Sequence, residues 1–224
     1  VEGKNIHLEK GYVNLYPFGV GGDWHVDTSD KTTIMGYDAG LNITGAVNGN
    51  TLFGTNAGKF ITSGVNNVGI GSNSCSASVA LTGDYNLCIG TSAGKTLQGD
   101  ADNNIYMGFK AGEVATTGDN NVVIGHQAAI LMTTASSNIM IGPYAGDAVT
   151  ESSDQLFIGR SSGSAMTLGA GNLTLGNYTL QVATVNTGND AGKPTGNTAI
   201  GYAALQDLNQ TDQTSGYGYN TAIG

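Results

Sequence analysis

A short phrase of alternating polar and apolar positions recurs along the whole chain. It begins with Asn, continues with an apolar residue or Thr, a variable residue and a large apolar residue, and ends with Gly. Asn121–Gly125 is its clearest copy, and further copies end at Gly108, Gly142 and Gly201. Because a phrase that returns at fixed spacing indicates one structural unit built many times, this pattern predicts a repeat architecture.

The glycine that closes each copy, called the anchor glycine below, returns every 17–19 residues over most of the chain. The last two intervals lengthen to 25 and 23 residues. The anchor glycines are Gly36, Gly54, Gly71, Gly90, Gly108, Gly125, Gly142, Gly159, Gly176, Gly201 and Gly224.

The positions one and three before the anchor glycine are apolar in most copies, with Thr at some ends of the array. Residues two apart share one face of a strand, so Val122 and Ile124 lie on the same side. We expect this face to be the buried interior of the coil. The residue between them, such as Cys88 or Tyr106, then lies on the opposite face.

The remaining columns predict corners and close contacts. The position four before the anchor is usually Asn, as in Asn121, Asn138 and Asn197. Asn accepts left-handed backbone and bonds neighbouring backbone, while Gly fits corners where a side chain would clash. The small residue three after the anchor lets coils approach closely. Short strands are unstable alone but pair when stacked roughly 4.8 Å apart, so we expect an all-β parallel β-solenoid with two short strands and two turns per coil.

Three regions follow from the regularity of the phrase. Residues 1–30 lack it, contain the only Trp, and are interpreted as a connecting or capping segment. Residues 31–180 form the regular array. Residues 181–224 keep the phrase but lengthen the loops, and we expect the array to continue beyond them, because the sequence ends inside a repeat.

Composition narrows the function classes. Glycine accounts for 36 of 224 residues without a Gly-X-Y register, and charged residues for only 11%. The net charge is −9, so phosphate-neutralising nucleic-acid binding is not expected. No stretch is long and apolar enough for membrane insertion, and no signal peptide is visible. Of the two readings of Cys75 and Cys88, we favour two small buried thiols over a disulfide.

The copies at 197–201 and 220–224 read Asn-Thr-Ala-Ile-Gly, and 197–205 reads Asn-Thr-Ala-Ile-Gly-Tyr-Ala-Ala-Leu. This resembles the repeat of phage tail fibres and appendages, and also the head of YadA-type trimeric autotransporter adhesins. The resemblance covers residues 32–224; the longer period favours the phage group. It implies a left-handed β-roll packed as a homotrimer, an extracellular virion appendage or cell-surface fibre, attachment to a cell-surface glycan or protein receptor, and no enzymatic step.

A homotrimer also has a rationale in the columns themselves. A thin coil encloses few side chains, so we expect the second apolar column and the small-residue column to need a partner surface. Three chains around one axis would cover both columns.

Several motifs resemble binding or catalytic sites, but other roles explain their residues. The run Gly90–Thr96 resembles a phosphate loop but is one residue short. The cluster Asp23, His25, Asp27 and Asp30 has metal-like composition, yet we interpret it as a solvated face. The acidic turn residues are interpreted as solubilising, although a glycan-degrading tailspike enzyme would need two of them in a groove; they are Asp84, Asp100, Asp102, Glu113 and Asp119. We therefore expect no catalytic, cofactor or metal site.

The position after the anchor glycine varies widely, which indicates an outward column. Its aromatic members are candidates for contact with a receptor, and packing against a neighbouring chain is the alternative role. The candidates are Tyr37, Phe109, His126 and Tyr202. The leading hypothesis is thus a structural and adhesive fibre, with a glycan-degrading tailspike as the alternative. A monomeric ice-binding solenoid would need a flat threonine ladder, and no column is uniformly Thr.

Overall fold

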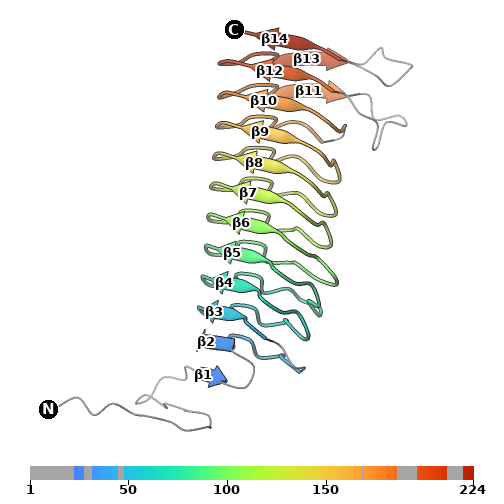
Figure 1. Ribbon diagram of the computed structural model, residues 1–224. Coiled ribbons are helices and arrows are strands. Elements are labelled where there is room, and N and C mark those ends of the chain that lie inside the picture. Colours follow the sequence, from blue (N-terminus) through green and yellow to red (C-terminus); the bar gives the residue numbers. More distant parts are fainter. Residues whose placement is uncertain (1–22, 28–31, 45–47, 168, 186–195, 211–218) are drawn as a thin grey trace, which may run out of the picture.

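The chain forms an elongated stack of coils with one parallel sheet along its side (Figure 1). The computed structural model describes residues 23–27, 32–44, 48–167, 169–185, 196–210 and 219–224, with backbone alone in β1, β11 and β13. None of these residues is helical, so the described part contains no helix that could cross a membrane. The predicted all-β parallel β-solenoid is confirmed.

Eleven strands stack in sequence order and pair in parallel. They are β2 (Thr32–Gly36), β3 (Thr51–Phe53), β4 (Val68–Ile70), β5 (Leu87–Ile89), β6 (Ile105–Met107), β7 (Val122–Ile124), β8 (Ile139–Ile141), β9 (Leu156–Ile158), β10 (Leu173–Leu175), β12 (Thr198–Ile200) and β14 (Thr221–Ile223). β1 (Asp23–Asp27) pairs antiparallel with β2. β11 (Val182–Val185) and β13 (Asp207–Gln210) form a separate parallel pair.

Every strand pairs with the equivalent residues of the next copy. Val122 lies opposite Ile139, and Ile124 opposite Ile141. The register survives the long interval late in the chain, since Leu173 pairs with Thr198. The expected second strand of each coil is less regular: within residues 48–167 it is reduced to the isolated bridges that join Ile61, Leu81 and Gly99.

The face predicted to be interior is the outer face, and this prediction was wrong. In β7, Val123 is fully buried while Val122 and Ile124 are partly exposed. The same holds in β6, where Tyr106 is buried between Ile105 and Met107. The alternation itself is correct, but the asparagine at the strand's entry already points inward, and period two then turns the central residue inward as well.

The interior is completed by two columns that lie within each coil. Apolar side chains on the far side of the coil pack against the central strand residues; they include Ile61, Leu81, Leu97, Met132, Val149 and Met166. The small residues three after the anchor, such as Ala111 and Ala128, are also fully buried. The small-residue column is therefore covered by its own chain, contrary to the expectation that it needs a partner surface.

The asparagines at the strand entries form a buried ladder along the stack. The Nδ2 of Asn121 donates to Oδ1 of Asn104 at 3.0 Å and to the Ala135 carbonyl at 2.8 Å. Asn138 repeats the bond to Asn121 at 3.0 Å. The expected bonding of Asn to neighbouring backbone is confirmed, but the left-handed position is the preceding residue, as in Asn120 with φ of 59°.

A disulfide joins Cys75 and Cys88, so the preference for two free thiols was wrong. Cys75 occupies the inward left-handed position four after the anchor, where most coils have Gly. Cys88 is the central residue of β5 in the next coil. Gly69, the central residue of Cys75's own coil, carries no side chain into the same space. This stacking brings the two Cα atoms within 5.8 Å.

Candidate functional site

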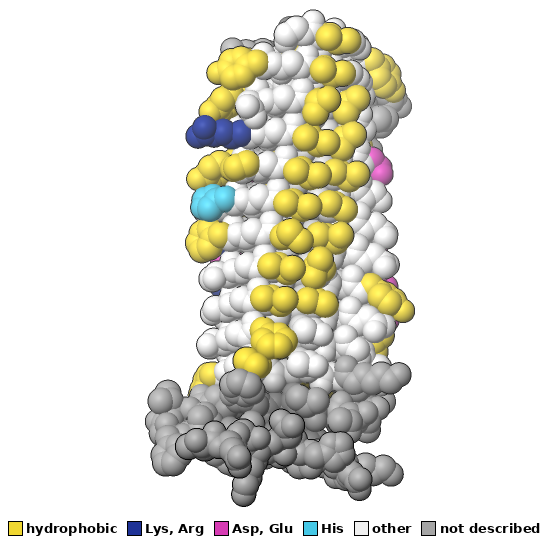
Figure 2. Space-filling view, turned by 60° about the vertical axis from the view of Figure 1, so that its left-hand side comes forward, with side chains coloured by type: hydrophobic (Ala, Val, Ile, Leu, Met, Phe, Trp, Pro, Cys, Tyr) yellow, Lys and Arg dark blue, Asp and Glu magenta, His cyan; other side chains and the backbone are white. Residues whose placement is uncertain are grey.

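One face of the sheet is largely apolar along the stack, with Thr in one of its two columns at both ends. The residues one and three before each anchor glycine point outward from β2–β10, β12 and β14, and they are called the apolar face. Figure 2 shows them as two adjacent hydrophobic stripes along the stack. Ile70 and Ile139 are each 40% exposed and Leu175 is 45% exposed.

The apolar face lacks charge along its whole length. Neither of its two columns contains an acidic or basic residue in these eleven strands. Its length is roughly 50 Å for strands spaced about 4.8 Å apart. A patch of that length and two side chains wide covers on the order of 500 Å², comparable to the largest patches on ordinary monomers, which are often functional.

A second outward surface runs along the turns that follow the strands. All four predicted contact residues lie on it and are exposed: Tyr37, Phe109, His126 and Tyr202. In the six coils from β6 to β12, aromatic and basic side chains follow one another in a row. This row is called the aromatic–basic ridge and consists of Phe109, His126, Tyr144, Arg160, Tyr178 and Tyr202.

The side chains of the ridge form two runs that are in contact from coil to coil, Phe109–His126–Tyr144 and Arg160–Tyr178–Tyr202. The His126 ring stacks on Phe109 with centroids 5.3 Å apart and meets the edge of Tyr144 at 5.2 Å. The Arg160 guanidinium lies 5.7 Å from the centre of Tyr178, and Tyr178 meets Tyr202 at 5.7 Å. Figure 2 shows hydrophobic, His and basic side chains along one edge, beside the apolar stripes.

Backbone pairing holds the ridge in line. The N–H of Tyr144 donates to the His126 carbonyl at 3.0 Å, and that of Tyr178 to the Arg160 carbonyl at 2.8 Å. The residue two after the anchor is left-handed in these turns, with φ of 61° at Tyr144 and 60° at Tyr178. Two neighbouring turn positions thus contribute side chains to one row.

The sequence prediction missed Tyr144 and Tyr178 because it considered only the residue directly after the anchor. Arg160 was in that column but was not singled out. The signal that could have found all three is the pair of positions one and two after the anchor. In each coil from β6 to β10 and in β12, at least one of the two is aromatic or basic.

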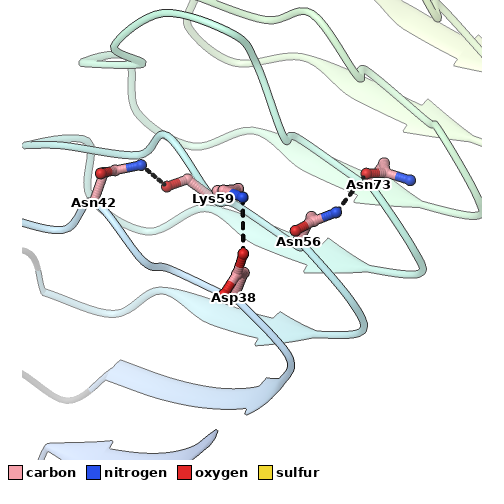
Figure 3. Close-up of polar contacts among 5 residues, drawn as sticks. All are labelled: Asp38, Asn42, Asn56, Lys59 and Asn73. Atoms are coloured by element: carbon pink, nitrogen blue, oxygen red, sulfur yellow. Dashed lines mark hydrogen bonds and ion pairs between the residues drawn. The ribbon is translucent and has the colours of Figure 1, made fainter. Parts of the chain in front are cut away.

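The same edge is small and polar in the first coils, apart from Tyr37. There the side chains hydrogen-bond one another (Figure 3): Asn56 donates to Asn73 Oδ1 at 3.0 Å, and Lys59 Nζ lies 2.8 Å from Asp38 Oδ2. Asn42 donates to the Lys59 carbonyl at 2.9 Å. In these coils the polar side chains of Asp38, Asn56 and Lys59 are thus paired within the protein.

Three of the acidic turn residues accept hydrogen bonds from backbone N–H groups of neighbouring coils. Asp84 accepts from the Val65 N–H at 2.7 Å, and Asp102 accepts from the Asp84 N–H at 2.7 Å. Asp119 accepts from the Asp102 N–H at 2.8 Å. Asp100 accepts from the Thr82 hydroxyl at 2.5 Å, and Lys110 lies 3.2 Å from Glu113. These contacts give each carboxylate a role in stacking or pairing.

The metal-like cluster and the phosphate-loop-like run form no binding site in the described part of the chain. No group of three or more His, Cys, Asp and Glu side chains there could hold a metal ion. The side chains of Asp23, His25, Asp27 and Asp30 lie outside the described residues. The phosphate-loop-like run forms a turn in which Thr96 donates to the Ala115 carbonyl at 2.9 Å.

One column of the repeat is rich in threonine, although it is not uniformly Thr. It occupies the position eight after the anchor at Thr44, Thr62, Thr116, Thr133, Thr150 and Thr167. The Thr116 hydroxyl donates to the Thr133 carbonyl at 3.1 Å, and Thr133 donates to Thr150 at 3.2 Å. The hydroxyls of Thr116 and Thr133 therefore bond along the stack.

Comparison with known proteins adds no family. No protein-family model matches the chain, and no curated protein or solved structure is significantly similar to it.

Proposed function

We propose that this chain is a structural and adhesive segment of an extracellular fibre, a left-handed β-roll that packs as a homotrimer and attaches to a cell surface. By the resemblance of its repeat phrase, we propose a phage tail fibre or a similar appendage. Its role in this proposal is reach and attachment, without an enzymatic step.

The apolar face is the observation that carries the proposal. Aliphatic side chains as exposed as those of Ile139 and Leu175 are unfavourable in water. The free-energy cost is about 25 cal/mol per Å² of apolar surface. Equivalent residues recur in register at every coil, so identical chains laid parallel can cover the face along its full length. Symmetric packing of copies around the fibre axis leaves no open apolar side.

The disulfide and the low charge support an extracellular location. Disulfides persist in oxidising environments and are rare where thiols are kept reduced. The Cys75–Cys88 bond links consecutive coils inside the core. A surface poor in charge and rich in Asn, Thr, Ser and Gly is common in extracellular β-fibres.

A pair of variants tests the role of the apolar face. Ile139→Asp places a charge on the face, whereas Leu131→Asp places one at a side chain that is 50% exposed in a turn outside the strands. We expect Ile139→Asp to dissociate the trimer, because a carboxylate desolvated between chains is costly, and Leu131→Asp to leave it intact. Light scattering after size-exclusion chromatography measures the chain mass of each variant.

Both variants should keep the β-solenoid fold, because neither side chain is buried. Circular dichroism checks that fold. Equal masses for the wild type, Ile139→Asp and Leu131→Asp would contradict assembly through this face. Binding of the fluorescently labelled wild type to intact bacterial cells tests the attachment half separately.

A further inference from the structure

We propose that the aromatic–basic ridge binds an extended acidic polysaccharide, whose sugar rings pack on the aromatic side chains and whose carboxylates pair with Arg160. This inference rests on the proposed attachment function and assigns it a place and a ligand class. The ridge spans Phe109 to Tyr202 in six successive coils.

The aromatic members offer apolar surface with polar edges, which suits sugars. Phe109 is 44% exposed and Tyr202 is 73% exposed. The C–H faces of sugar rings pack on aromatic rings, and the phenol of Tyr and the imidazole of His126 provide hydrogen bonds at the rim. The rings support one another through stacked and edge contacts, so little side-chain freedom is lost when a ligand binds.

Arg160 supplies a positive charge in the middle of the row that has no ion pair among the described residues. The two ion pairs in the described part of the chain are Lys59–Asp38 and Lys110–Glu113, and neither involves Arg160. Its guanidinium is exposed and lies over the Tyr178 ring. A planar guanidinium pairs with a carboxylate through two parallel hydrogen bonds, so the charge favours an anionic ligand although the chain carries a net charge of −9.

The repetition of the ridge indicates a polymer rather than a single sugar. Neighbouring coils present the next side chain after about 4.8 Å, the spacing of paired strands. A chain of pyranose rings advances by a similar length for each sugar. A polymer lying along the stack therefore meets one coil after another, and weak contacts add through their proximity.

The charge distribution disfavours nucleic acid on the same surface. Single-stranded nucleic acid also uses aromatic and basic side chains, but it needs several cations to neutralise its phosphates. Among the described residues, the Arg160 guanidinium has no ion pair, and the Lys110 ammonium lies 3.2 Å from Glu113. A polymer with isolated carboxylates and apolar sugar faces fits this charge better.

Isothermal titration calorimetry of the full chain with sodium hyaluronate, a polysaccharide that carries a carboxylate on every second sugar, tests the proposal. We expect Arg160→Gln to weaken hyaluronate binding about tenfold, as expected for the loss of one charge-assisted pair. Lys95→Gln removes the same charge from an exposed lysine outside the ridge and should leave the affinity unchanged. Tyr202→Ala should weaken binding severalfold, whereas Tyr85→Asn, which removes an exposed Tyr from another turn, should not.

Neutral dextran and a single-stranded oligonucleotide are measured alongside. Three outcomes would overturn the inference: no binding of hyaluronate, equal weakening by Lys95→Gln and Arg160→Gln, or oligonucleotide binding as tight as hyaluronate binding. Chain mass is measured for each variant. A trimeric wild type that attaches to cells but does not bind hyaluronate refutes this inference alone, whereas a monomeric wild type refutes the proposed function.

Discussion

The anchor glycine of each coil lies against the backbone of the next anchor glycine. A Cβ added at Gly108 would lie 2.5 Å from the Gly125 carbonyl oxygen, and Gly108 has φ of 133°. Both the space and the backbone therefore require glycine at this column. At the residue scale, each side chain is constrained by the coil above it as much as by its neighbours along the chain.

Gly108→Ala should lower the free energy of unfolding by about 3 kcal/mol or more, because backbone atoms of the next coil must shift. Gly171→Ala is the matched control, since Gly171 has φ of 73° but nothing within 4 Å of an added Cβ. It should cost only about 1 kcal/mol for left-handed backbone. Denaturant unfolding at fixed chain concentration compares the two, and equal losses would refute the stacking role of the anchor.

Because the Tyr106 hydroxyl is buried, we expect the free energy of unfolding to fall at alkaline pH. Its hydroxyl is buried without a well-formed hydrogen bond among the described residues, and burial raises its pKa above the ordinary 10.0, although the Asn121 side chain acts in the opposite direction. The unfolded chain releases this proton from pH 10 upward while the folded chain keeps it. The stability is therefore intact below pH 10 and falls above it, by about 1.4 kcal/mol per pH unit.

Tyr106→Phe removes this proton and should flatten that part of the pH profile. The measurement is the difference in unfolding free energy between the wild type and Tyr106→Phe from pH 9 to pH 11. If the two profiles run parallel, the buried hydroxyl does not titrate as described.

At the scale of the strand, most strands are only three residues long, so pairing with neighbouring coils stabilises them. The buried asparagine ladder fixes the entry of each strand: Asn121 bonds Asn104, Asn138 and the Ala135 carbonyl. Gln155 takes the same place in β9's coil and continues the ladder through its Oε1 to Asn172. A side-chain amide is what the position requires, because it both donates and accepts along the axis.

Asn121→Ala should lower the free energy of unfolding by about 3 kcal/mol, since the Ala135 carbonyl and the N–H and Nδ2 of Asn138 lose their buried partner. Asn120→Gly changes the exposed left-handed residue just before it and should be neutral or slightly stabilising. Thermal unfolding of both variants at one concentration separates these effects. A loss for Asn121→Ala no larger than for Asn120→Gly would contradict the ladder.

The period and the strand columns could be predicted from the sequence, because stacking forces equivalent residues into register. The direction of each face could not, since hydrophobicity assigns the Ile124 column to the interior, whereas the inward asparagine reverses that assignment. The Cys75–Cys88 bond depends on which columns meet inside the coil, which spacing alone does not give. The sequence predicted only part of the ridge, because the ridge uses the two positions after the anchor glycine and the prediction considered only the first.

At the scale of the whole molecule, the solenoid separates two surfaces with different tasks. The apolar face carries no charge in its two columns, and the ridge beside it carries aromatic rings and Arg160. In our account, the first surface joins copies of the chain and the second contacts the ligand. Long fibres gain reach from stacking and affinity from repetition.

The central claim is that chains associate in threes through the apolar face. Sedimentation equilibrium of the native chain measures this directly, without a shape assumption. The account predicts one species of three times 22.7 kDa, about 68 kDa, across a range of concentrations. A folded species of 22.7 kDa that persists at high concentration would contradict it.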